Sequence, residues 1–177
     1  MREPAPTGAG HTDYWHALRM SALEMIMHGH YRKARRILFR LLASHPNGFA
    51  RAYELTYLYL ASEGAGLDPG STVKPHLLHH ADPLWPMPVL LDLMGRICQK
   101  ALLESVLKGN APERLCEATY YLGFQAKLRG HRRLALRYFR ASLQTAVVGY
   151  AEYMGAALAL RQLTSPRLPP PHKPNPP

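Results

Sequence analysis

The chain has 177 residues, with 22 Lys or Arg against 12 Asp or Glu, so its formal charge is +10 at pH 7. A hydrophobic content of 47% can bury a core, and the length favours one domain or one compact repeat array. Two cysteines exclude a disulfide scaffold, and no apolar run approaches the ~20 residues of a membrane-spanning helix. Because we find neither a signal peptide nor a lipidation motif, we expect a cytoplasmic location.

Apolar residues recur at helical spacing over residues 14–44, with one interruption around Gly29. Two helices joined by a tight glycine turn must bury their apolar stripes on each other, so this part of the sequence predicts a helical hairpin. A third helix is expected over residues 49–62, and Gly64 and Gly66 mark its end.

Residues 64–88 are predicted to form a long irregular insertion, because prolines recur there at short intervals. A structureless loop of that length is unusual inside a compact domain, so we expect either a short helix within residues 75–81 or mobility. Residues 89–107 have a helical pattern, with a potential break at Gly95.

A second helical hairpin is expected over residues 111–145, with its turn at Gly130. A terminal helix over residues 150–163 would cover the exposed apolar face of this hairpin. No run of alternating β-branched residues occurs, so the sequence predicts an all-α domain over residues 12–163. We expect disorder in residues 1–11 and in the Pro-rich tail, residues 164–177.

The two predicted hairpins repeat one another. Shifting the sequence by 101 residues pairs Gly29 with Gly130, and pairs Ala34 with Ala135. The second hairpin also matches the positions of a tetratricopeptide (TPR) unit. Small residues allow close helix approach at Gly123 and Ala135, the turn is at Gly130, and an aromatic ring fills the space between hairpins at Phe139. Leu122-Gly123 is the usual Leu-Gly pair of such a unit. Residues 15–163 therefore resemble the TPR family, which implies an α-solenoid of helical hairpins, with the irregular insertion inside it.

A narrower resemblance covers residues 85–163. The motifs from Trp85 to Val89, from Leu93 to Ile97 and from Arg114 to Gly123 follow in this order. Together they resemble the C-terminal half of bacterial TPR lipoprotein adaptors of the NlpI type, whose signal peptide and lipidated cysteine are not found in this sequence. The resemblance implies a non-catalytic adaptor, a scaffold or chaperone-like protein of bacterial type that holds other proteins together.

In a TPR array, the concave groove is lined by one face of each first helix. In the registers above, that face carries these aromatic, basic and apolar side chains: Arg19, Leu23, Tyr53, Tyr57, Tyr120, Phe124 and Lys127. Rings offer contact area at low entropic cost, so such a groove would bind an extended peptide or a helix of another protein. The alternative is that these side chains pack against neighbouring hairpins.

Basic residues form two clusters at matching places in the repeat. They lie on the second helix of each hairpin: Arg32, Lys33, Arg36 and Arg40, and Arg132, Arg133, Arg137 and Arg140. Such clusters suit an accessory subunit that docks on nucleic acid or on an anionic membrane or protein surface. A solvated helix face explains the same pattern. Independently of these clusters, the sequence leaves a homo-oligomer open.

Signals for metal binding or catalysis are weak. His76, His79 and His80 lie at short spacing, but a zinc site usually needs a third protein ligand, so we predict no metal and no cofactor. Cys98 and Cys116 are expected within amphipathic helices as small buried groups. Acidic residues are scattered with no close pair, and we therefore expect no enzymatic activity.

Overall fold

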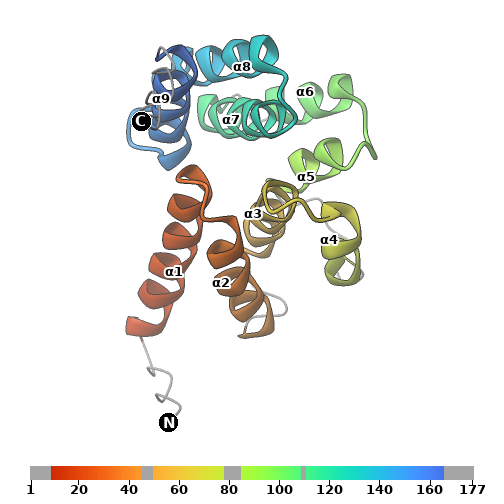
Figure 1. Ribbon diagram of the computed structural model, residues 1–177, viewed down its shortest axis with the longest axis vertical. Coiled ribbons are helices and arrows are strands. Elements are labelled where there is room, and N and C mark those ends of the chain that lie inside the picture. Colours follow the sequence, from red (N-terminus) through yellow and green to blue (C-terminus); the bar gives the residue numbers. More distant parts are fainter. Residues whose placement is uncertain (1–8, 45–49, 78–84, 109–110, 166–177) are drawn as a thin grey trace, which may run out of the picture.

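The structure is a computed structural model that describes residues 9–44, 50–77, 85–108 and 111–165. Helices are the only regular elements in these ranges, which confirms the all-α prediction (Figure 1). The described residues form these helices: α1 (Ala9–Met27), α2 (Tyr31–Ser44), α3 (Arg51–Gly64), α4 (Pro69–Leu77), α5 (Met87–Leu93), α6 (Gln99–Leu107), α7 (Pro112–Leu128), α8 (Arg132–Gln144) and α9 (Ala151–Thr164).

Four of the turns between helices have the same backbone geometry. In each turn the N–H that follows a glycine bonds to a carbonyl five residues earlier, as from His30 to Met25 at 2.7 Å and from His131 to Ala126 at 2.8 Å. This is the Schellman motif, which needs a left-handed residue and therefore favours glycine. The glycines, with φ between 69° and 78°, are Gly29, Gly66, Gly95 and Gly130. The turns join α1 to α2, α3 to α4, α5 to α6 and α7 to α8.

The helices pack in succession, and the last one returns to the first. α2 contacts both α1 and α3, and α8 contacts both α7 and α9. α3 lies near the centre of the view in Figure 1 and contacts α5 and α7, so it connects the two halves of the chain. α9 covers the α7–α8 hairpin as the sequence predicts, and it also contacts α1.

The two predicted hairpins have the packing that their amphipathic patterns require. α2 buries Ala34, Leu38 and Leu41 and turns its basic side chains outward. In α7–α8, a Cβ on Gly123 would lie 3.0 Å from carbon atoms of the Phe139 ring, so the two helices can approach this closely only because position 123 has no side chain.

Residues 64–88 are less irregular than predicted, because they contain α4 and the start of α5. Asp68 stabilises the beginning of α4: its carboxylate accepts hydrogen bonds from the N–H of Gly70, at 3.0 Å, and from the hydroxyl of Ser71. Pro69 suits the first helical position, and the fully buried Val73 anchors α4 to the core. The sequence pattern Asp-Pro-Gly-Ser is therefore a helix start rather than a simple turn. Residues 78–84 lie outside the described residues.

The start of the first helix differs from the expected one. α1 begins at Ala9, three residues before the predicted domain start at 12, as helix ends without a strong capping signal are poorly specified by local sequence. The potential break at Gly95 is confirmed, because a turn there divides residues 89–107 between α5 and α6. Disorder was predicted for residues 1–11 and 164–177, but residues 9–11 lie in α1 and Thr164 ends α9. Residues 1–8 and 166–177 lie outside the described residues.

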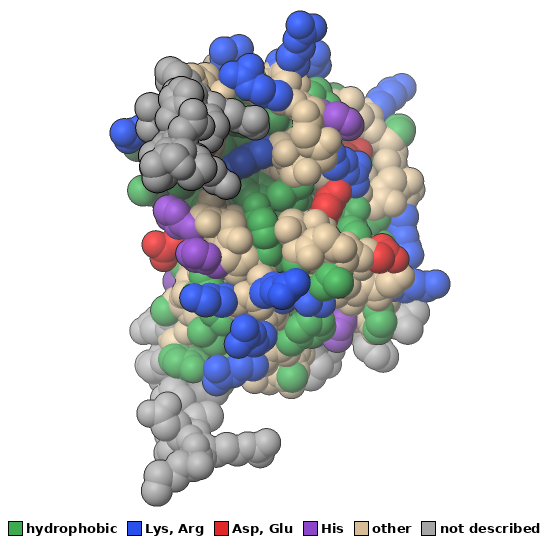
Figure 2. Space-filling view, in the orientation of Figure 1, with side chains coloured by type: hydrophobic (Ala, Val, Ile, Leu, Met, Phe, Trp, Pro, Cys, Tyr) green, Lys and Arg blue, Asp and Glu red, His purple; other side chains and the backbone are tan. Residues whose placement is uncertain are grey.

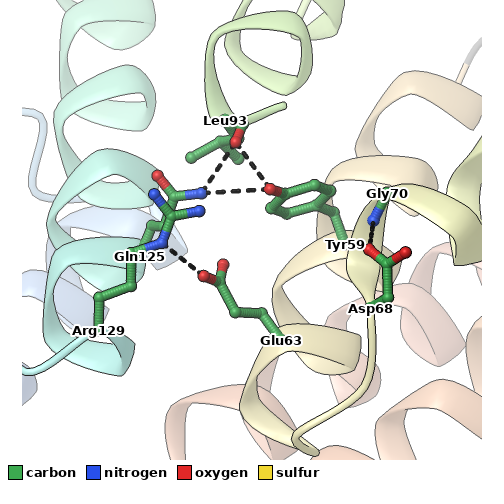
Figure 3. Close-up of polar contacts among 7 residues, drawn as sticks. All are labelled: Tyr59, Glu63, Asp68, Gly70, Leu93, Gln125 and Arg129. Atoms are coloured by element: carbon green, nitrogen blue, oxygen red, sulfur yellow. Dashed lines mark hydrogen bonds and ion pairs between the residues drawn. The ribbon is translucent and has the colours of Figure 1, made fainter. Parts of the chain in front are cut away.

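A polar joint connects α3, α5 and α7 at the centre of the molecule (Figure 3). The carbonyl of Leu93, at the end of α5, accepts hydrogen bonds from the Tyr59 hydroxyl at 2.7 Å and from the Gln125 amide at 3.0 Å. Beside it, Arg129 Nε donates to Glu63 Oε1 at 2.6 Å. These contacts satisfy a carbonyl that the end of α5 would otherwise leave unpaired.

Candidate functional site

The close approach of α9 to α1 and α7 depends on one glycine. A Cβ on Gly155 would lie 2.7 Å from Met27 Cε in α1 and 2.7 Å from Tyr120 Cε2 in α7. Neither contact leaves room for a side chain, so Gly155 lets α9 lie directly on both helices. The surface between α1 and α9 is formed by this contact, and the candidate site lies there.

Glu152, in the first turn of α9, is a buried carboxylate with two tyrosine donors. Its Oε1 accepts hydrogen bonds from Tyr121 of α7 at 2.5 Å and from Tyr57 of α3 at 3.2 Å. Its side chain is 5% exposed. A buried carboxylate is tolerated only when donors replace its lost hydration, and here two different helices supply them.

Glu117 of α7 is a second buried carboxylate near Glu152. It accepts hydrogen bonds from the Tyr53 hydroxyl, at 3.1 and 3.2 Å to its two oxygens, and from Trp85 Nε1 at 2.5 Å. Burial, followed by the nearby charge of Glu152, raises the pKa of Glu117 to about 7. The hydrogen bonds from Trp85 and Tyr53 lower this pKa but do not outweigh the burial.

A pocket of about 370 Å³ opens over these carboxylates, and we call it the polar pocket. Arg19 contributes the basic side chain of its wall and forms an ion pair with Glu54 at 3.4 Å. The complete lining comes from α1, α3, α7, α9 and the turn before α9: His16, Arg19, Met20, Tyr53, Tyr57, Glu117, Gly149, Tyr150, Ala151 and Glu152.

A larger pocket of about 590 Å³ adjoins the polar pocket and is mainly apolar. The two share Met20 and Ala151, so together they form one depression that we call the α1–α9 groove. Met154, at its edge, is 66% exposed. The lining of this apolar pocket is Ala17, Met20, Ser21, Leu23, Glu24, Met27, His28, Ala151, Met154 and Leu158.

The residues predicted to line a concave groove are divided between this groove and the core. Arg19, Tyr53 and Tyr57 line the polar pocket, and Leu23 lines the apolar pocket. Tyr57 and Leu23 are only 2% and 1% exposed and also belong to the hydrophobic core.

The other three predicted residues lie at the packed side of α7. Tyr120 and Phe124 are each 1% exposed and form part of the hydrophobic core. Lys127 lies over the Phe124 ring at 5.4 Å and donates to Gln162 of α9 at 2.7 Å. α9 therefore occupies the place where this part of the groove was expected.

The two acidic residues of the polar pocket were not predicted from the sequence. Acidic residues form no close pair along the chain, whereas the structure brings Glu117 and Glu152 to one pocket, because α9 folds back across α7. A usable signal was present: Glu117 lies within the most apolar stretch of α7, four residues before Tyr121, where a solvated charge is unexpected.

The two basic clusters lie on the outside of the molecule. Figure 2 shows Lys and Arg side chains gathered over α2 and, at the top, over α8. These side chains are exposed, and within the described part of the chain none of them forms an ion pair: Arg32, Lys33, Arg36, Arg40, Arg132, Arg133, Arg137 and Arg140. Arg132 donates to the Leu163 carbonyl at 2.6 Å.

The structure describes one of the three histidines considered as metal ligands, and it describes both cysteines. His76 lies half-buried in α4, while His79 and His80 lie outside the described residues. The described residues contain no group of three or more metal-ligating side chains. Cys116 is buried as expected, but Cys98 is exposed and precedes α6, because the Gly95 turn interrupts the helix predicted there. Among the described helices, none has the length and apolar character needed to cross a bilayer.

No protein-family model matches the chain, and neither the curated proteins nor the solved structures include a match to it.

Proposed function

We propose that the protein is a non-catalytic, TPR-like adaptor that binds a segment of another protein in the α1–α9 groove. The observation that carries this proposal is the pair of adjoining pockets, of about 370 and 590 Å³, between the first and last helices. Pockets of this size accept side chains of a bound segment, and depressions with apolar walls and a few convergent polar groups are typical binding sites.

The arrangement of helical hairpins supports the TPR-like part of the proposal. Four hairpins with equivalent glycine turns follow one another, and a terminal helix covers the last of them. Arg19, Tyr53 and Tyr57 come from the first helices of two hairpins and face one pocket, as side chains of a concave surface would. The bound segment would then lie beside α9 rather than across an open array.

The hydrogen bonds of the polar pocket favour binding over catalysis. Both carboxylates already accept hydrogen bonds from aromatic donors: Glu117 from Tyr53 and Trp85, and Glu152 from Tyr57 and Tyr121. Such bonds hold a carboxylate in a fixed orientation and reduce its readiness to move toward a reacting group. A recognition role uses this rigidity directly.

Site-specific photo-crosslinking in the native host would test the adaptor proposal. A photoreactive residue at Met154, which is 66% exposed in the groove, should crosslink one defined segment of a partner protein, mapped by mass spectrometry. The matched control is the same residue at Leu107, which is 72% exposed on α6 and lines neither of the two pockets of the groove. Equal crosslinking from both positions, or none from Met154, would contradict the proposal.

A second candidate is an accessory subunit that docks on nucleic acid or another anionic surface. It is favoured by the exposed basic residues of α2 and α8, which have no ion pair with any described acidic residue. Replacing Arg32, Lys33, Arg36 and Arg40 with Gln should then abolish a mobility shift of duplex or single-stranded nucleic acid at low salt. If the unaltered protein causes no shift at low salt, the nucleic-acid form of this candidate is excluded.

A further inference from the structure

The polar pocket is acidic although the chain as a whole carries a formal charge of +10. Glu117 and Glu152 are each 5% exposed, so water screens their charges weakly. Among the described residues, the one Lys or Arg in the lining is Arg19, and it already pairs with Glu54 at 3.4 Å. His16, exposed at the rim, is the other basic side chain there. Outside the lining, Arg114 lies over the Trp85 ring at 5.5 Å, and its charge acts on Glu117. Within the described lining of the pocket, neither Arg19 nor His16 forms an ion pair with Glu117 or Glu152.

Arg19 adds an independent sign that the pocket is incomplete. Its Nε atom is buried and has no hydrogen-bond partner, although the side chain as a whole is 17% exposed. A buried donor without an acceptor costs about 1–3 kcal/mol, so such groups are usually satisfied. Nε is inaccessible in this conformation, so the Arg19 side chain must turn toward the pocket before a carbonyl oxygen of a bound chain can supply the missing acceptor. The carboxylates require positive charge.

The walls of the polar pocket also suit a cation. Tyr53 and Tyr57 form a tilted pair with ring centroids 6.3 Å apart, and Tyr150 lies at the opening with 38% exposure. Aromatic rings attract ammonium and guanidinium groups through their negative faces, most strongly where water is excluded. Buried carboxylates, aromatic walls and an unsatisfied N–H donor thus point to one kind of occupant, a basic side chain with its own backbone.

The apolar pocket indicates which type of residue lies next to that basic side chain in the bound segment. It begins at Met20 and Ala151, where the polar pocket ends, and continues along Met27, Met154 and Leu158. Methionine side chains adapt to different apolar partners, as at other protein-binding surfaces. A segment that fills both pockets must therefore carry an apolar residue a short distance from a basic one.

We propose that the α1–α9 groove recognises a segment of a partner protein in which a Lys or Arg enters the polar pocket and a nearby large apolar residue enters the apolar pocket. This inference rests on the proposed adaptor function and specifies the partner. The basic group bonds to Glu117 and Glu152, and a backbone carbonyl of the segment accepts a hydrogen bond from Arg19.

The experiment begins with selection from a displayed library of random 12-residue peptides on the full-length protein at pH 8. The enriched peptides should share one basic position and one apolar position at a constant spacing. A synthetic enriched peptide is then compared with its twin carrying norleucine in place of the basic residue, by fluorescence polarisation. The norleucine peptide should bind at least about tenfold more weakly, as expected for the loss of a hydrogen bond to a charged group.

Two protein variants separate this inference from the adaptor proposal. Glu117→Gln keeps the acceptor for Tyr53 and removes the charge, so the preference for the basic peptide should fall below about threefold. Glu152→Gln should reduce the preference for the basic peptide in the same way. The control is Glu104→Gln, at an exposed position on α6, which should keep the full preference. Met154→Glu should weaken both peptides. Denaturation curves show whether each variant is folded.

Each outcome decides between the two proposals. Enriched peptides without a basic position, or an unchanged preference in folded Glu117→Gln and Glu152→Gln, would overturn the inference and leave the adaptor proposal standing. No enrichment, or binding unaffected by Met154→Glu, would overturn both. Two other results would identify this chain itself as the occupant and would overturn the proposal of a foreign partner. One is displacement of the enriched peptide by a peptide of residues 165–177. The other is a dimer that dissociates in the Met154→Glu variant.

Discussion

The hydroxyl of Tyr57 in α3 donates a 3.2 Å hydrogen bond to the carboxylate of Glu152 in α9, which joins residues 95 positions apart in the sequence. Tyr121 of α7 donates to the same oxygen at 2.5 Å, so one buried carboxylate holds three helices together. Because Glu152 also lines the polar pocket, the contact that attaches α9 forms part of the candidate binding surface. The stability of the fold and the shape of the candidate binding surface are therefore coupled at this residue.

Removing one tyrosine hydroxyl from this contact should measure its contribution. Tyr121→Phe leaves the buried Glu152 carboxylate with one tyrosine donor fewer, and we expect the free energy of unfolding to fall by about 1–3 kcal/mol. Urea denaturation followed by circular dichroism is the measurement. Tyr150→Phe, at a ring that is 38% exposed beside the same pocket, should change stability by less than about 0.5 kcal/mol. If both variants lowered the free energy of unfolding equally, the hydrogen bond from Tyr121 to Glu152 would not contribute to stability as stated.

The raised pKa of Glu117 predicts that part of the stability depends on pH. The pKa is about 7 in the folded chain against an ordinary value of 4.5, so between these pH values the folded state holds a proton that the unfolded state has released. The free energy of unfolding therefore falls as the pH rises through this window, by up to about 3 kcal/mol.

The measurement compares urea denaturation at pH 4.5 and pH 8 for the unaltered protein and for Glu117→Gln. The variant cannot titrate at this position, so the difference between the two pH dependences isolates Glu117 from the histidines. We expect the fall in stability to be smaller in the variant. Identical pH dependence in both proteins would show that Glu117 ionises at its ordinary pKa.

Gly155→Ala should loosen α9. The added Cβ would lie 2.7 Å from Met27 Cε and from Tyr120 Cε2. The Met27 side chain can turn away, but the buried Tyr120 ring can move only by displacing its neighbours, at a cost of about 1–3 kcal/mol. Gly149→Ala, where no atom lies within 4 Å of the added Cβ, is the matched control and should change stability by less than about 0.5 kcal/mol. If the denaturation curves of the two variants coincided, the close contact of α9 at Gly155 would not limit the size of the side chain there.

Features of the chain that are encoded locally could be predicted from the sequence. Gly29 and Gly130 mark turns by their own conformational preference, and both have positive φ in the structure. The α7–α8 hairpin and its cover by α9 follow from apolar periodicity. The short helix expected within residues 75–81 is α4, but it begins earlier, at Pro69, because its start, Asp68-Pro69, has the composition of a turn.

The acidic part of the candidate site could not be predicted in the same way. Glu117 and Glu152 lie 35 positions apart. The apolar surroundings of Glu117 in the sequence indicate burial, but no local pattern indicates that Glu152 lies beside it. Only the return of α9 to α1 and α7 buries both carboxylates and brings them to the tyrosines of α3. That return requires tertiary packing at Gly155, which no helical periodicity encodes.

The joint at Leu93 predicts a cooperative effect between two side chains. Its carbonyl accepts from Tyr59 at 2.7 Å and from Gln125 at 3.0 Å, so either donor alone keeps it paired (Figure 3). Tyr59→Phe and Gln125→Ala should each cost about 0.5–1.5 kcal/mol, and the double variant should cost about 1 kcal/mol more than their sum, because it leaves the carbonyl buried and unpaired.

A double-mutant cycle by urea denaturation tests this coupling. Combining Tyr59→Phe with the exposed Glu104→Gln provides the reference, and these two changes should add within about 0.5 kcal/mol because they share no partner. Additivity in the Tyr59 and Gln125 cycle would mean that the Leu93 carbonyl finds another donor, such as water. The joint would then not bind α3, α5 and α7 into a single cooperative unit.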